Sequence, residues 1–151
     1  MGFIERYFPK TDNFLLAGIK LALLDLVFLT GSGVIAFALF SLVGMVRRVG
    51  IPIPLPVWLF SLFLVIPYYV FCFEYGRAYG SRNKTRRVFR GFLVGFLGHT
   101  PNFALLFVLI QGEFYKYFDP QIWRIIFTML EMISIVAPIM VVLGATDRKQ
   151  K

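Results

Sequence analysis

Long apolar stretches, separated by short charged segments, occupy most of the chain. Residues 26–46, 49–73 and 91–112 contain no Asp, Glu, Lys or Arg and are 21, 25 and 22 residues long. A fourth stretch, residues 122–143, carries only Arg124 and Glu131 as charges. About 20 apolar residues in a helix cross the hydrocarbon core of a bilayer. The pattern predicts an all-α integral membrane protein with four transmembrane helices and short loops, forming a single domain over residues 1–151.

We place the four spans at about residues 25–46, 57–75, 91–111 and 122–143. The first apolar segment is longer than one crossing requires, because a helix over residues 14–46 would measure about 50 Å against a core of ~30 Å. We therefore expect a possible N-terminal interfacial helix before the first span. The Thr-Gly-Ser-Gly sequence at residues 30–33 leaves two alternatives for residues 14–33, a kinked span and a re-entrant hairpin.

The distribution of Lys and Arg predicts the orientation. With four spans, one side of the membrane receives 12 of these residues and the other receives 4. Because short cytoplasmic loops carry the excess of basic residues, both termini and the polar loop at residues 76–90 are expected in the cytoplasm, with the plasma membrane as the location. Six basic residues of that loop are predicted to contact anionic lipid headgroups, namely Arg77, Arg82, Lys84, Arg86, Arg87 and Arg90.

The amino-acid composition excludes several classes of function. Hydrophobic residues make up 58% of the chain, and the net charge of +8 follows the expected topology, so no nucleic-acid partner is predicted. One His and one Cys exclude a His/Cys metal cluster and an internal disulfide. Cys72 is expected to be a packed hydrophobic side chain. No motif for catalysis is recognisable, so no enzyme activity, metal or cofactor is predicted.

Two ionisable residues fall near the middle of predicted spans. His99 lies in the third span and Glu131 in the fourth, at matching depth. Groups at that depth are costly unless they are paired or face protein or water. We expect a hydrogen-bonded His99–Glu131 pair in a polar midplane site that also includes Asn102 and Ser134. Such a site is either a packing contact or a proton relay.

Small residues and prolines add to this picture. Gly91, Gly95 and Gly98 share an arc of about 100° with His99, so they predict a face for close helix packing. Prolines inside the second, third and fourth spans each free a backbone carbonyl and are candidates for kinks; they are Pro67, Pro101 and Pro138.

Asp25 lies near the cytoplasmic end of the first span. Lys20 is about 140° away around the helix, so it is not a helical partner and is expected to reach the lipid phosphates. We expect Asp25 to cap a neighbouring helix or to pair with an Arg of the 76–90 loop. Glu74 and Arg77 are expected to form a local ion pair.

Two functions fit these features. The first is a non-catalytic multi-pass membrane protein that acts through helix–helix association, as an accessory subunit or a homo-oligomer. The alternative is a small-solute or proton-coupled transporter or channel that uses the His99/Glu131 site. Expected partners are membrane lipids and further copies of the chain or a larger membrane complex. A polar, water-reachable cavity at the site would favour transport, whereas dry packing would favour the accessory role.

Overall fold

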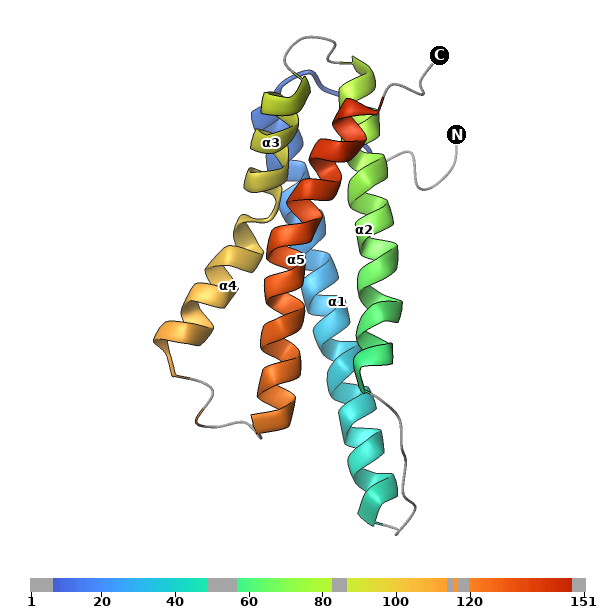
Figure 1. Cartoon of the computed structure of the whole chain (residues 1–151), viewed down its shortest axis with the longest axis vertical. Helices are drawn as coiled ribbons and strands as arrows, with labels where there is room; N and C mark the ends of the chain where they lie inside the picture. Colours follow the sequence, from blue (N-terminus) through green and yellow to red (C-terminus); the bar gives the residue numbers. More distant parts are fainter. Residues whose placement is uncertain (1–6, 49–56, 83–86, 114–115, 117–119, 148–151) are drawn as a thin grey trace.

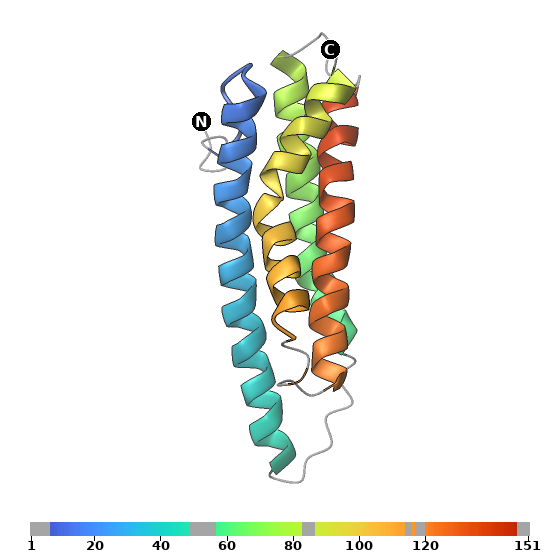
Figure 2. The same ribbon diagram turned by 90° about the vertical axis from the view of Figure 1, so that its left-hand side faces the viewer.

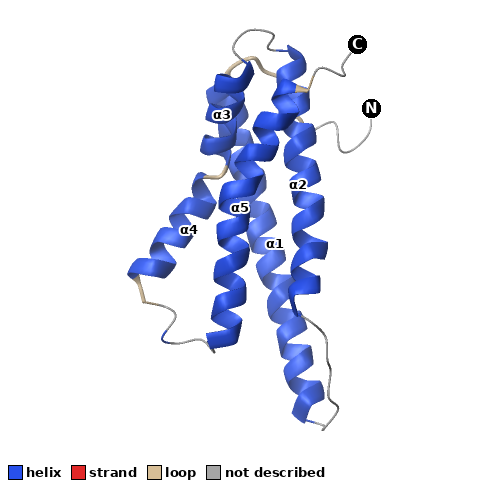
Figure 3. Ribbon diagram, viewed as in Figure 1, coloured by secondary structure: helices blue, strands red, loops and turns tan. Residues whose placement is uncertain are grey.

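A computed structural model describes residues 7–48, 57–82, 87–113, 116 and 120–147. These residues form an all-helical fold (Figures 1 and 3). Its five helices are α1 (Phe14–Arg48), α2 (Val57–Arg82), α3 (Arg87–Gly98), α4 (Thr100–Gln111) and α5 (Pro120–Thr146).

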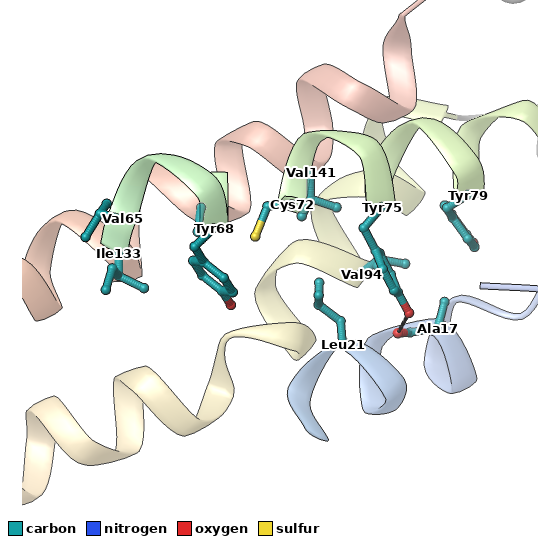
Figure 4. Packing of buried hydrophobic residues seen from close by; sticks show 11 residues of the cluster. Ala17, Leu21, Val65, Tyr68, Cys72, Tyr75, Tyr79, Val94, Ile133 and Val141 are labelled. Atoms are coloured by element: carbon teal, nitrogen blue, oxygen red, sulfur yellow. Dashed lines mark hydrogen bonds between the residues drawn. The ribbon is translucent and has the colours of Figure 1, made fainter. Parts of the chain in front are cut away.

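The helices lie along one long axis. α1 begins and α5 ends at the same end of the bundle, and α1 extends beyond the other helices at the opposite end (Figures 1 and 2). The chain direction in α2 and α5 is opposite to that in α1, α3 and α4. α2 packs along α5, and α3 packs between α1 and α5. Buried side chains from α1, α2, α3 and α5 meet in one core (Figure 4).

The first apolar segment is one continuous helix. α1 begins after Asn13, whose side-chain oxygen accepts a hydrogen bond from the Leu15 amide at 2.9 Å. Such a bond satisfies an amide that has no partner inside the helix. At the predicted break, Thr30 and Ser32 donate to carbonyl groups of the preceding turn of α1. The alternative of a re-entrant hairpin at residues 30–33 is therefore wrong, and the helix begins 11 residues before the predicted span.

The predicted third span, residues 91–111, is broken into α3 and α4, which are bent by 47°. The break lies at His99, two residues before Pro101. Proline lacks an amide hydrogen, so it leaves the Leu97 carbonyl without its helical donor. The Thr100 hydroxyl donates to that carbonyl at 2.9 Å instead. Pro67 and Pro138, in contrast, lie within helices that continue past them.

The predicted loop at residues 76–90 is mostly helical. α2 continues to Arg82 and α3 begins at Arg87. This correction puts four of the six predicted lipid-contact residues in helices: Arg77 and Arg82 in α2, Arg87 and Arg90 in α3. Lys84 and Arg86 lie outside the described residues.

The ion pair predicted next to this connection is confirmed. An Arg77 guanidinium nitrogen lies 3.1 Å from a Glu74 carboxylate oxygen, one helical turn away. Lys20 differs from the prediction, because its ammonium group donates to the Phe8 carbonyl at 2.9 Å.

Within the part of the chain that the structure describes, two helices contain segments long and apolar enough to cross a membrane, Phe14–Ile35 in α1 and Phe127–Thr146 in α5. The bent pair of α3 and α4 makes a third if it counts as one span. The count of four spans stays a prediction.

Glycines allow the backbones of α2 and α5 to come into contact. A Cβ atom at Gly76 or Gly80 would overlap a backbone carbonyl of α5, and one at Gly144 would overlap the Phe73 carbonyl of α2. Small residues allow such backbone contact between helices in membranes. These three glycines were not predicted from the sequence as a packing face.

The three glycines expected to mediate packing lie in α3 and are buried. A Cβ at Gly91 would be 2.9 Å from the Ala145 Cβ atom, and one at Gly95 would be 2.9 Å from the Pro138 carbonyl oxygen, both in α5. Gly98 faces the Leu21 side chain of α1. α3 therefore uses these glycines against two different helices.

Candidate functional site

Four polar side chains meet where α3 bends into α4; three come from α1, α2 and α4, and the fourth is that of His99 at the break. Asp25, His99 and Asn102 are 0% exposed and Tyr68 is 4% exposed. We call these four residues the buried polar cluster. A polar group removed from solvent is costly unless it has hydrogen-bond partners, so the partners define what the cluster can do.

The Asp25 carboxylate is the acceptor at the centre of the cluster. The Tyr68 hydroxyl donates to Oδ1, and the Asn102 amide nitrogen donates to Oδ1 and Oδ2, both at 2.9 Å. Among the described residues no Lys or Arg pairs with Asp25. The predicted partners, a helix cap or a loop Arg, are therefore wrong, because Asp25 is held by neutral donors from α2 and α4.

His99 connects to the same hydroxyl from the other side. Its Nδ1 atom lies 2.7 Å from the Gly95 carbonyl oxygen and its Nε2 atom lies 3.2 Å from the Tyr68 oxygen. A carbonyl oxygen only accepts hydrogen bonds, so Nδ1 carries a hydrogen. Nε2 is then either a bare acceptor or the second N–H of an imidazolium ion.

Two arrangements of the shared protons fit this geometry. If Tyr68 donates to an ionised Asp25, its oxygen accepts a hydrogen bond from His99 only when His99 is an imidazolium ion. If Asp25 is instead a neutral carboxylic acid that donates to Tyr68, Tyr68 can donate to a neutral His99. Both arrangements hold the same number of protons and no net charge. They differ by the movement of one proton from Tyr68 to Asp25 and of a second proton from His99 to Tyr68.

Either of these two arrangements would bury Asp25 without a net charge on the cluster. Without the shared proton, the cluster would carry one uncompensated negative charge in an apolar interior, which is costly. The arrangement can therefore hold one proton and pass it between Asp25 and His99.

Cys72 lies beside the cluster, one helical turn after Tyr68. Its sulfur is 3.7 Å from Nε2 of His99, and the side chain is fully buried. The described residues contain no group of three or more His, Cys, Asp or Glu side chains that could hold a metal ion.

Two further tyrosines extend the contact between α2 and α1. The Tyr75 hydroxyl donates to the Ala17 carbonyl at 2.7 Å (Figure 4), and the Tyr79 hydroxyl donates to the Asp12 carbonyl at 3.3 Å. With Tyr68, these residues form a row on the face of α2 that is turned toward α1. Their hydroxyls join α2 to α1 and, through Asp12, to the segment just before α1.

The structure brings together only part of the predicted midplane site. His99 and Asn102 are in the cluster, and Ser134 is buried on α5 with an Oγ atom that has no hydrogen-bond partner. Glu131 lies on the exposed side of α5. The expected His99–Glu131 pair is not formed, because His99 faces Tyr68 and Cys72 of α2 instead.

Sequence reasoning missed Asp25 and Tyr68 as site residues. The available signal was an Asp in an apolar run with no basic residue one turn away, which requires donors from other helices. Tyr68 and Asn102 were candidate donors in neighbouring apolar runs. Periodicity gives no relative depth or rotation of separate helices, so it did not select them.

The chain matches no protein-family pattern, no curated protein and no solved structure in these comparisons.

Proposed function

We propose that this protein is a four-span membrane protein of the plasma membrane that acts through helix–helix association and not through catalysis. In this proposal both termini are cytoplasmic, and the protein works as an accessory subunit or as a homo-oligomer. α1 begins and α5 ends at one end of the bundle, which agrees with termini on one side.

The distribution of polar and apolar side chains carries this proposal. The buried polar cluster is fully enclosed, whereas large apolar side chains point outward, such as Val27 at 69%, Phe107 at 64% and Ile135 at 61% exposure. Water favours the reverse arrangement, and lipid favours this one. The burial of the cluster supports an accessory role over transport.

α4 supports association in particular. After the bend at His99 it diverges from α5 (Figure 1), and Asn102 is its only buried residue. Leu105, Phe107, Val108 and Ile110 are all exposed. A helix that packs so little against its own chain offers surface to lipid or to another protein.

The basic residues at the cytoplasmic end support a lipid contact. Arg77, Arg87 and Arg90 are in helices at the end where α5 terminates. Each basic group near an anionic leaflet contributes about 1 kcal/mol of attraction. We infer that this end of the bundle binds anionic headgroups.

The experiment is to extract the full chain from its native membrane in polymer-bounded lipid discs and to measure the mass of the protein complex. The proposal expects two or more copies of the chain, or one copy with a second protein. A lone chain in every disc would contradict it.

A second function, proton-coupled transport, is favoured by one observation. The Tyr68 hydroxyl lies within hydrogen-bond distance of both Asp25 and His99, so a proton shared by the three groups could shift between them without a change in net charge. Loss of that proton would leave a buried charge, and a conformational change that admits water would relieve it. In this alternative the bend at His99 is the moving part.

This alternative is tested in proteoliposomes loaded with a pH-sensitive dye. Transport predicts a proton flux that Asp25→Asn and Tyr68→Phe both remove, whereas Cys72→Ala, beside the cluster, retains it. A wild-type flux equal to that of empty vesicles would contradict it.

A further inference from the structure

The exposed side of α5 carries a carboxylate among large apolar side chains. Glu131 is exposed, and in the described part of the chain it makes no hydrogen bond or ion pair. It follows 11 residues of α5 and precedes 15, so it lies about 16 Å from the beginning of the helix. If the ~40 Å helix is centred on a ~30 Å core, the Glu131 backbone lies about 10 Å inside that core.

The residues around Glu131 form a continuous apolar face. Met132, Ile135, Ile139 and Leu143 are 45%, 61%, 49% and 50% exposed. With the exposed Thr128, they recur every three or four residues and share an arc of about 80°, and Glu131 lies about 40° beyond its edge, next to Ile135. We call Thr128, Met132, Ile135, Ile139 and Leu143 the exposed α5 face. Its spacing suits the packing of one long helix along another.

An ionisable residue that faces lipid is costly, and such residues almost always pair or face protein. The buried polar cluster does not provide that pairing, because Asp25 is already held there by Tyr68 and Asn102. The carboxylate therefore needs a partner from outside the chain.

We propose that the exposed α5 face binds a membrane-spanning helix of a different protein, which places a Lys or Arg beside Glu131. This inference rests on the proposed function and names the chemistry of the partner. A cation compensates the carboxylate directly, and its long side chain can reach Glu131 from a packed helix.

A second copy of this chain fits the face less well. Two α5 helices packed in parallel would bring one Glu131 against the other, and like charges repel. The segment from Ile125 to Thr146 contains no Lys or Arg, so the same face of a second copy supplies no cation. Charge complementarity therefore favours a different protein.

The test uses the full chain, labelled at its C-terminus with a fluorescent donor, in phosphatidylcholine vesicles. The probe is a synthetic Leu-Ala transmembrane peptide with one central Lys and an acceptor dye, and the control peptide has Leu in place of the Lys. We expect the Lys peptide to bind about tenfold more tightly than the control, as one favourable polar contact between membrane helices predicts. Glu131→Leu should remove that difference.

Two variants show whether the face itself matters. Glu131→Leu with Val27→Glu moves the carboxylate to an exposed position on α1 and should not restore preferential binding of the Lys peptide. Equal binding of the two peptides to the wild type, or full restoration by the moved carboxylate, would overturn the proposal. Glu131→Gln, a nearly isosteric change, should also remove most of the preference, and an unchanged preference would overturn it.

The outcome can be separated from that of the proposed function. Multi-protein discs from native membrane together with no preference for the Lys peptide would reject this partner chemistry alone. Lone chains in those discs together with a Lys preference would reject the accessory role and retain the site.

Discussion

The contact between α2 and α5 differs sharply from the surroundings of α4. At the first, Gly76, Gly80 and Gly144 let two backbones meet, and no side chain lies between them. At the second, one residue of a twelve-residue helix is buried, and that residue is polar. The bundle is thus joined by glycine contacts in one region and by the hydrogen bonds of Asn102 in the other. The comparison teaches that a membrane bundle can fix part of its fold by shape and part by polar contacts, while the remaining apolar surface stays open for a partner.

The largest effect is expected from filling the α2–α5 contact. Gly144→Leu would force the side chain into the Phe73 carbonyl and separate the backbones, so it should lower the free energy of unfolding by about 3 kcal/mol. Gly144→Ala should act in the same direction. The measurement is reversible unfolding in detergent micelles.

Gly31→Leu is the matched control, because a Cβ at Gly31 meets no atom within 4 Å. It should change stability by no more than about 0.5 kcal/mol. Similar losses from the two glycines would mean that the close contact does not hold the fold.

A smaller loss is expected in the buried polar cluster. Asp25→Leu leaves the Tyr68 hydroxyl and the Asn102 amide without their acceptor, and a buried unsatisfied group costs about 1–3 kcal/mol. Combined with Tyr68→Phe, it should give a coupling energy of at least about 0.5 kcal/mol in a double-mutant cycle.

The pair expected from the sequence serves as the contrast to this cycle. His99→Ala and Glu131→Gln should be additive, because Glu131 lies on the exposed side of α5 and shares no partner with His99. Coupling between them as strong as that between Asp25 and Tyr68 would contradict the described arrangement.

Disturbing the packing of α3 should lower stability by a similar or smaller amount. Gly95→Leu pushes against the Pro138 carbonyl and should cost about 1–3 kcal/mol. Leu93→Ile, about 160° away around the helix, should cost less than 1.5 kcal/mol as a volume-conserving change. Equal thermal shifts for the two would remove the case for a directed glycine face.

The smallest effect on stability is expected from substitutions that alter the orientation of the chain in the membrane. Neutralising Arg82, Lys84, Arg86 and Arg87 together should leave folding intact and mix the topology, because these residues are part of the cytoplasmic excess of positive charge. A reporter active only in the cytoplasm should work when fused at Lys151 and fail at Glu113. The opposite result would reverse the orientation.

The sequence predicted the helical class well and the site only in part. Uncharged runs indicated where apolar helices lie, since that signal depends only on local composition. Pro101 produced a bend at His99, whereas Pro67 and Pro138 did not end their helices. The depth of His99 and Asn102 was readable, but the rotation of α5 was not. Glu131 was therefore placed in the site and Asp25 outside it, because only tertiary packing determines which residues of different helices meet.

The most direct test of an associating membrane protein is photo-crosslinking within the membrane. A photoreactive amino acid would be placed at position 135 on the exposed α5 face and, separately, at position 27 on α1, both exposed positions. Association through a partner helix on the exposed α5 face predicts a discrete protein adduct from position 135 in native membranes and mainly lipid adducts from position 27. Lipid adducts alone from both positions would contradict it.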